Sequence, residues 1–99
     1  MEENTTRQTL NLIRQDLELP DEALALDENH AILLLSKAVK ELLDRDFERM
    51  LQICYRIDLS EFTLKKILNE SDPENLSLDL AKALWDRQKQ KVEMRKRYS

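Results

Sequence analysis

Cys54 and His30 are the residues whose side chains could act together as a nucleophile and a general base. The sequence holds one cysteine and one histidine, so no other pair of this kind is available. A reactive thiol needs a partly exposed and electropositive setting. Cys54 instead has the helical spacing of one apolar, inward face, which it shares with Phe47, Met50, Leu51 and Ile57. We therefore predict that Cys54 is a core residue and that the protein is not an enzyme.

A carboxylate-x-x-histidine spacing occurs at Asp27 and His30 and looks like one metal-binding arm of a di-iron helical bundle. Such a centre needs two arms of this kind and two further inward glutamates, and the sequence has no second histidine. Asp and Asn are also favoured residues immediately before a helix. We therefore expect Asp27 or Asn29 to cap a helix, and we expect no metal and no other cofactor.

Tyr55, Arg56 and Asp58 form a polar cluster at the end of an apolar helical segment. Arg56 could bind a carboxylate or a phosphate through two parallel hydrogen bonds. Alternatively, Asp58 holds Arg56 while the backbone enters a turn, which suits the helix-start signal of Leu59 and Ser60 directly after it. The structural interpretation is favoured, and any ligand pocket is expected at this cluster.

Charge is distributed unevenly along the chain, whose net charge is −4. Residues 1–30 carry eight acids and two bases, whereas residues 87–99 carry six bases and one acid. These basic residues could contact phosphates, but the sequence pI of about 5.0 is far from the basic footprint of a nucleic-acid-binding domain. A helix with a thin apolar line and charged flanks suits a protein partner better. We expect a homodimer or a contact with another protein, and weak nucleic-acid binding is the alternative.

The elements that position these residues are expected to be helices. The sequence has no glycine, which argues against hairpin-rich sheets and phosphate-cradling loops, and its apolar residues recur every three or four positions. We predict one all-α domain over residues 1–99, a compact bundle of about five helices. The helices are expected near residues 6–19, 27–43, 46–57, 61–69 and 74 to beyond 92. The spacing of the apolar residues within 21–29 allows one further helical turn. Whether the second and third helices are continuous stays open.

Particular residues mark the helix ends and faces. Asp46 can cap the third helix, and Ser60 the fourth, where Leu59 and Leu64 have the spacing of a hydrophobic staple. The fifth helix is expected to begin with Asp72 as its cap or with a capping box that starts at Ser71. Its apolar content falls after Trp85, so residues 87–99 are expected to project, to fray or to pack against a partner.

The remaining observations concern the cellular compartment. The first ten residues lack the positive start and apolar run of a secretory signal, and the longest apolar run, residues 31–35, is far too short to cross a membrane. One cysteine cannot form an internal disulfide. We therefore expect a cytoplasmic protein with no membrane contact.

Two segments, FERMLQICYRIDLSE at 47–61 and WDRQKQK at 85–91, resemble a family of small, uncharacterised, all-helical bacterial proteins with a YRID-type motif. The resemblance implies an all-helical domain and, because the family has no assigned function, transfers no catalytic residue. Cys54 stands where the family pattern has a plain aliphatic residue, which favours the core interpretation. The polar motif positions are Arg56, Asp58, Arg87 and Gln88.

The function predicted from these observations is a non-enzymatic structural or protein–protein interaction module. The residues predicted to take part in an interaction are polar or aromatic and lie in the two motif segments or in the basic helix end. They are Tyr55, Arg56, Asp58, Arg87, Gln88, Lys91, Arg95 and Arg97.

Overall fold

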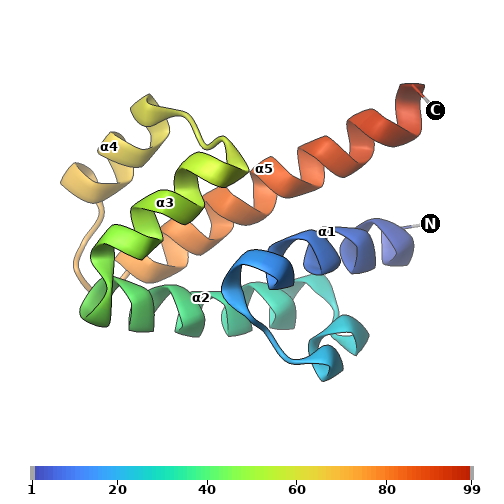
Figure 1. Ribbon diagram of the computed structural model, residues 1–99, viewed down its shortest axis with the longest axis horizontal. Helices are drawn as coiled ribbons and strands as arrows, with labels where there is room; N and C mark the ends of the chain where they lie inside the picture. The colour runs from blue at the N-terminus through green and yellow to red at the C-terminus, as the bar shows by residue number, and fades with distance from the viewer. Residues whose placement is uncertain (1, 99) are drawn as a thin grey trace.

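The computed structural model describes residues 2–98, and it describes side chains over residues 5–97. Within this part the chain is helical and contains no strand, which confirms the predicted all-α fold (Figure 1). The elements are α1 (Glu2–Leu17), the 3-10 turn η1 (Asp21–Ala25), α2 (Glu28–Arg45), α3 (Phe47–Ile57), α4 (Glu61–Glu70) and α5 (Leu76–Tyr98).

Three helices begin at side-chain caps that the sequence predicts. At each of them a side-chain oxygen accepts a hydrogen bond from the backbone N–H three residues later, which satisfies one of the unpaired donors of the first turn. The caps are Asp27, Asp46 and Ser60, with distances of 2.9, 3.1 and 3.0 Å. Because Asp46 leaves the helical conformation at φ −148° and ψ 72°, α2 and α3 are separate helices.

Several helix ends differ from the prediction. Helix α1 begins at Glu2 and not near residue 6, and α2 continues to Arg45. Helix α1 ends at Leu17 because Glu18 adopts a left-handed conformation with φ 53°, and this turns Leu19 into the core before Pro20. Helix α5 begins at Leu76, after a turn in which the Asn75 N–H donates to the Asp72 carbonyl. The expected caps of α5 are therefore wrong.

Ser71, one of these expected caps, has another partner. Its hydroxyl donates to Asp79 Oδ2 at 2.8 Å, in the first turn of α5. This bond joins the residue after α4 to α5.

Helix α5 is the central support of the bundle. Its inward side buries Leu80, Leu84, Trp85 and Val92, and α1, α2, α3 and α4 all pack against it (Figure 1). Figure 1 shows the first part of α5 beside α2 and α3, and its second part beside α1. None of the helices within residues 2–98 combines the length and the apolar character needed to span a bilayer.

The second half of α5, which was expected to project in part, packs in the bundle as far as Val92 and is exposed beyond it. Gln88 and Val92 are buried, and Lys96 Nζ donates to Thr5 Oγ1 of α1 at 2.6 Å. Exposed side chains become continuous only over residues 93–97. The second half of α5 has few apolar residues, so its sequence alone does not predict burial. It is nevertheless partly buried, because α1 packs against α5.

Candidate functional site

The two segments that carry the predicted interaction residues meet at the C-terminal end of α3. Arg87 of α5 donates from Nε to the Asp58 carbonyl and from Nη2 to Asp58 Oδ2, both at 3.1 Å, and from Nη1 to Gln90 Oε1 at 2.9 Å. Lys91 Nζ donates to the Ile57 carbonyl. The last carbonyls of a helix lack intrahelical partners and carry partial negative charge. Two cations of α5 therefore cap α3.

Asp58 is the residue that links the end of α3 to Arg87. It adopts a left-handed conformation (φ 66°, ψ 41°), a place that glycine usually occupies and that Asp tolerates better than most residues. Its N–H donates to the Tyr55 carbonyl at 3.0 Å, and the N–H of the buried Leu59 donates to the Cys54 carbonyl at 2.9 Å. These two bonds form a Schellman motif. The predicted turn is confirmed, whereas the carboxylate of Asp58 pairs with Arg87 and not with Arg56.

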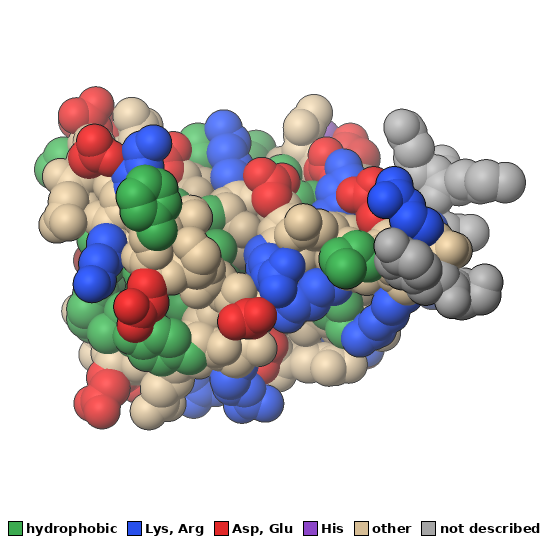
Figure 2. Space-filling model, turned by 90° about the horizontal axis from the view of Figure 1, so that it is seen from above, with side chains coloured by type: hydrophobic (Ala, Val, Ile, Leu, Met, Phe, Trp, Pro, Cys, Tyr) green, Lys and Arg blue, Asp and Glu red, His purple; other side chains and the backbone are tan. Residues whose placement is uncertain are grey.

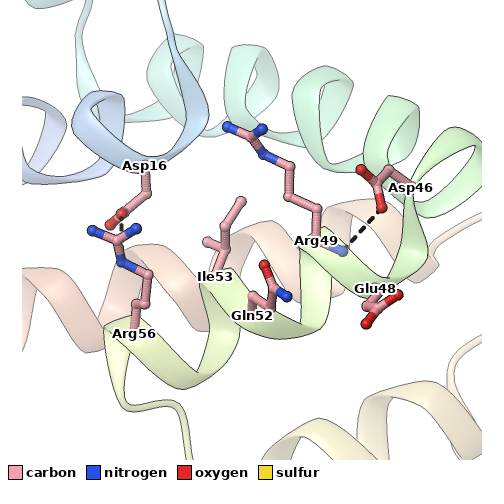
Figure 3. Close-up of a pocket in the computed structure, with 7 residues that line it drawn as sticks. All are labelled: Asp16, Asp46, Glu48, Arg49, Gln52, Ile53 and Arg56. Atoms are coloured by element: carbon pink, nitrogen blue, oxygen red, sulfur yellow. Dashed lines mark hydrogen bonds and ion pairs between the residues drawn. The ribbon is translucent and has the colours of Figure 1, made fainter.

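Arg56 lies on the other side of α3, in a groove between α3 and the end of α1 (Figure 3). Its Nε is 3.4 Å from Asp16 Oδ1, and two turns earlier Arg49 Nη2 is 3.5 Å from Glu18 Oε1. Figure 3 shows Asp16 and Arg56 facing each other from the two helices. The groove has a volume of about 520 Å³ and is lined by Asp16, Asp46, Glu48, Arg49, Gln52, Ile53 and Arg56.

The charges of this groove do not select an external anion. Three carboxylates and two guanidinium groups line it, so its formal charge is −1. The carboxylate that Arg56 faces is the protein's own Asp16, whose side chain is 15% exposed while that of Arg56 is 75% exposed. The arrangement holds the acidic end of α1 against α3.

A second hollow opens between the α3–α4 turn and α5. It has a volume of about 690 Å³ and is lined by Asp58, Leu59, Ser60, Thr63, Ala83, Asp86, Arg87 and Gln90. Of the cluster at which the sequence predicts a ligand pocket, only Asp58 lines this hollow, whereas Arg56 lines the groove beside α1 and Tyr55 lines neither. The Ser60 hydroxyl donates to Thr63 Oγ1 at 3.1 Å, and Arg87 uses its donors on Asp58 and Gln90. The polar groups of this hollow are thus largely bonded to one another.

Cys54 and His30 lie in different surroundings. Cys54 is completely buried, as predicted, and loss of solvation raises the pKa of its thiol to about 11. His30 is exposed, and its Nδ1 lies 2.7 Å from Asp27 Oδ1 at the start of α2. The backbone hydrogen bond from His30 is the main cause that lowers the pKa of Asp27. Within the described residues, no group of three or more His, Cys, Asp or Glu side chains could hold a metal ion.

Most basic side chains at the end of α5 donate hydrogen bonds to other groups of the chain. Glu28 Oε2 accepts from Lys89 Nζ at 2.9 Å and from Trp85 Nε1 at 3.0 Å, which ties the start of α2 to α5. The bond from Lys89 is the main cause that lowers the pKa of Glu28, and the bond to Glu28 raises the pKa of Lys89. Arg95 and Arg97 are exposed and make no hydrogen bond or ion pair with the part of the chain that the structure describes.

Two further predicted residues have contrasting positions. Gln88 is 5% exposed, and its Oε1 has no hydrogen-bond partner among the described residues. A residue so deeply buried cannot contact a partner directly. Tyr55 is 57% exposed on the outer side of α3 and is available for contact.

Exposed aromatic side chains are the feature that the sequence analysis missed. Phe47 and Phe62 are 45% and 77% exposed, and Figure 2 shows hydrophobic side chains at several places among charged ones on the face seen from above. Phe47 was expected on the inward side of α3, but it lies at the edge of a face centred on Met50 and Ile57, at the first residue of the helix. Phe62 falls outside the inward spacing of α4, a signal that the sequence does contain.

No protein-family model, no curated protein and no solved structure matches this chain. The resemblance to the YRID-type family therefore stays a prediction. The two motif segments are nevertheless in contact, through the hydrogen bonds of Arg87 and Lys91 with the end of α3.

Proposed function

We propose that this protein is a small helical protein-interaction module that binds its partner through exposed aromatic side chains of α3 and α4. The residues that carry the proposal are Phe47, Tyr55 and Phe62. Of the four aromatic side chains that the structure describes, these three are exposed and Trp85 is buried. Large aromatic side chains are enriched at protein interfaces and among the residues that dominate binding energy.

Exposed aromatic side chains gain free energy if a partner buries them. Moving a Phe side chain from full exposure to full burial contributes roughly 1.5–3 kcal/mol. Phe62 realises little of this within the chain because it is 77% exposed. In the polar hollows on both sides of α3, in contrast, the three arginines that line them already pair with groups of the same chain. Contact with a protein therefore accounts for more of this surface than binding of a small ligand.

A pull-down from the native host with two matched variants tests the proposal. In one variant Phe47, Tyr55 and Phe62 are replaced by Ser; in the other, Leu33 and Met94 are replaced by Ser. The two control residues are 54% and 49% exposed but lie on α2 and α5. Proteins bound by the wild type should be lost with the first variant and kept with the second, with both variants shown to be helical by circular dichroism. Equal losses would contradict the proposal.

A homodimer is the special case in which the partner is a second copy of the chain. Light scattering of the full-length protein over a range of concentrations tests it, because the mass doubles if the dimer forms. Removing residues 87–99 is a poor test, since Gln88 and Val92 are part of the buried interior.

The alternative, weak nucleic-acid binding by the basic end of α5, has less support. Arg87, Lys89, Lys91 and Lys96 are all bonded within the chain. Binding of a labelled DNA duplex or RNA strand at about 50 and about 200 mM salt tests the alternative, because phosphate contacts weaken steeply with salt. We expect no salt-dependent binding; a steep loss with salt would favour the alternative.

A further inference from the structure

Helix α4 is held to the bundle by fewer buried side chains than α3, a helix of nearly the same length. Of the ten residues of α4, Leu64 is buried, and Ile67 and Leu68 are half-buried against the core. Helix α3 has eleven residues and buries four of them. Because most of the stability of a helix in a protein comes from packing of its apolar face, α4 is the less firmly attached of the two.

Polar contacts add little to the attachment of α4. The helix packs mainly against α5, and Figure 1 shows it at the edge of the bundle. Within the described residues, no side chain of residues 61–70 makes a hydrogen bond or ion pair with another helix, and Thr63 bonds with its own cap, Ser60. The side-chain bond that ties this region to α5 comes from the residue after the helix, from Ser71 to Asp79 Oδ2 at 2.8 Å.

The helices before and after α4 are supported without it. The end of α3 accepts hydrogen bonds from Arg87 and Lys91 of α5. The start of α5 follows a turn of its own, in which the Asn75 N–H donates to the Asp72 carbonyl at 2.9 Å. Neither support uses a residue of α4, so separation of α4 from α5 leaves both in place.

We infer that α4 is a lid that opens and closes while the rest of the bundle stays folded. Segments 58–60 and 71–75 act as its hinges, and the Ser71–Asp79 bond acts as a latch. In the open state the apolar side of α4 leaves the core, and the part of α5 that it covers becomes accessible. Units with few buried apolar contacts open in this way at a free energy below that of global unfolding. The inference does not depend on the proposed function, because the lid opens whether or not a partner is present.

Hydrogen exchange of the full-length protein, measured by mass spectrometry at several urea concentrations below the unfolding transition, tests the inference. The readout is the protection of the amides of residues 64–71, which donate hydrogen bonds in the closed helix. They should be at least roughly tenfold less protected than the amides at the centres of α2 and α3. Their protection should also depend less on urea, because local opening exposes less surface than global unfolding. Equal protection and equal urea dependence in α3 and α4 would overturn the inference.

Two serine variants test the latch. Ser71→Ala removes the bond to Asp79 and should lower the protection of residues 64–71 by roughly tenfold, with α2 and α3 unchanged. Ser36→Ala is the matched control, because Ser36 is also half-buried and its hydroxyl donates to Ser77 Oγ at 3.4 Å, between α2 and α5. It should leave the protection of residues 64–71 relative to α3 unchanged. An equal loss of protection in all helices of Ser71→Ala, or no loss at residues 64–71, would contradict the inference.

Discussion

Replacing Gln88 by Met should make the protein more stable. Gln88 was expected to be an interaction residue, but it is buried in the second half of α5. Its Oε1 has no hydrogen-bond partner in the described part of the chain. Methionine has a similar length, is also unbranched, and has nearly the same helix propensity. The substitution therefore changes the polarity of this position more than its shape.

The expected size of the effect follows from two opposing contributions. A buried polar atom without a partner costs about 1–3 kcal/mol of the free energy of unfolding. A volume-conserving change in a packed core costs up to about 1.5 kcal/mol through imperfect fit. The net gain expected for Gln88→Met is about 1 kcal/mol. For a domain of this size that gain raises Tm by about 4–8 °C.

Thermal and urea unfolding followed by circular dichroism measure the gain. Gln90→Met is the matched control, because Gln90 lies two residues further along the same helix and is exposed, and its Oε1 accepts from Arg87. This control loses a hydrogen bond and removes no buried polar atom, so its stability should be unchanged or slightly lower.

A fall of more than about 1 kcal/mol in Gln88→Met would refute the reasoning, because a loss of that size is typical of removing one partner of a satisfied buried hydrogen bond. Gln88→Leu provides a second readout with a branched side chain. If both variants are destabilised equally, the amide is paired and the buried site requires a polar group.

Three further predictions concern the polar contacts and the thiol. The lowered pKa of Glu28, caused mainly by its bond from Lys89, means that this carboxylate stabilises the fold above its ordinary pKa of 4.5 and that the stabilisation is lost as pH falls through the lower folded value. The Tm difference between wild type and Glu28→Gln should therefore be largest near neutral pH and vanish in acid; a difference that grows on acidification would contradict it. Arg87→Lys should lower the free energy of unfolding, measured in urea, by about 1 kcal/mol. The planar guanidinium group donates to both the carbonyl oxygen and Oδ2 of Asp58, and an ammonium group cannot reproduce this geometry. Cys54 should react with a thiol reagent only as fast as the protein unfolds, because burial raises its pKa to about 11; rapid labelling of the native protein would show an accessible thiolate.

The starts of α2, α3 and α4 could be predicted because their causes are local. Asp27, Asp46 and Ser60 act on N–H groups three residues away, so a short window of sequence contains donor and acceptor together. The same holds for the pairing of Leu59 with Leu64, which are both buried on either side of the Ser60 cap. Local spacing also identified Cys54 as a core residue.

The partners of the charged residues could not be predicted because they depend on which helices become neighbours. The sequence places Asp58 next to Arg56 in the chain, yet its carboxylate pairs with Arg87, 29 residues away. Gln88 and Phe47 were misjudged for the same reason. Burial of Gln88 depends on the helices that pack around α5, and exposure of Phe47 on the absence of a helix over it. The residues next to them in the sequence determine neither condition.

The position of α5 has a consequence for how the chain matures. Helices α1, α2, α3 and α4 all pack against α5, and the hydrogen bond from Lys96 to Thr5 joins residues 91 positions apart. During synthesis, α1 to α4 emerge before α5, which is the surface against which each of them packs. Their apolar faces therefore stay uncovered until α5 has been made, and in that interval a chaperone can bind them.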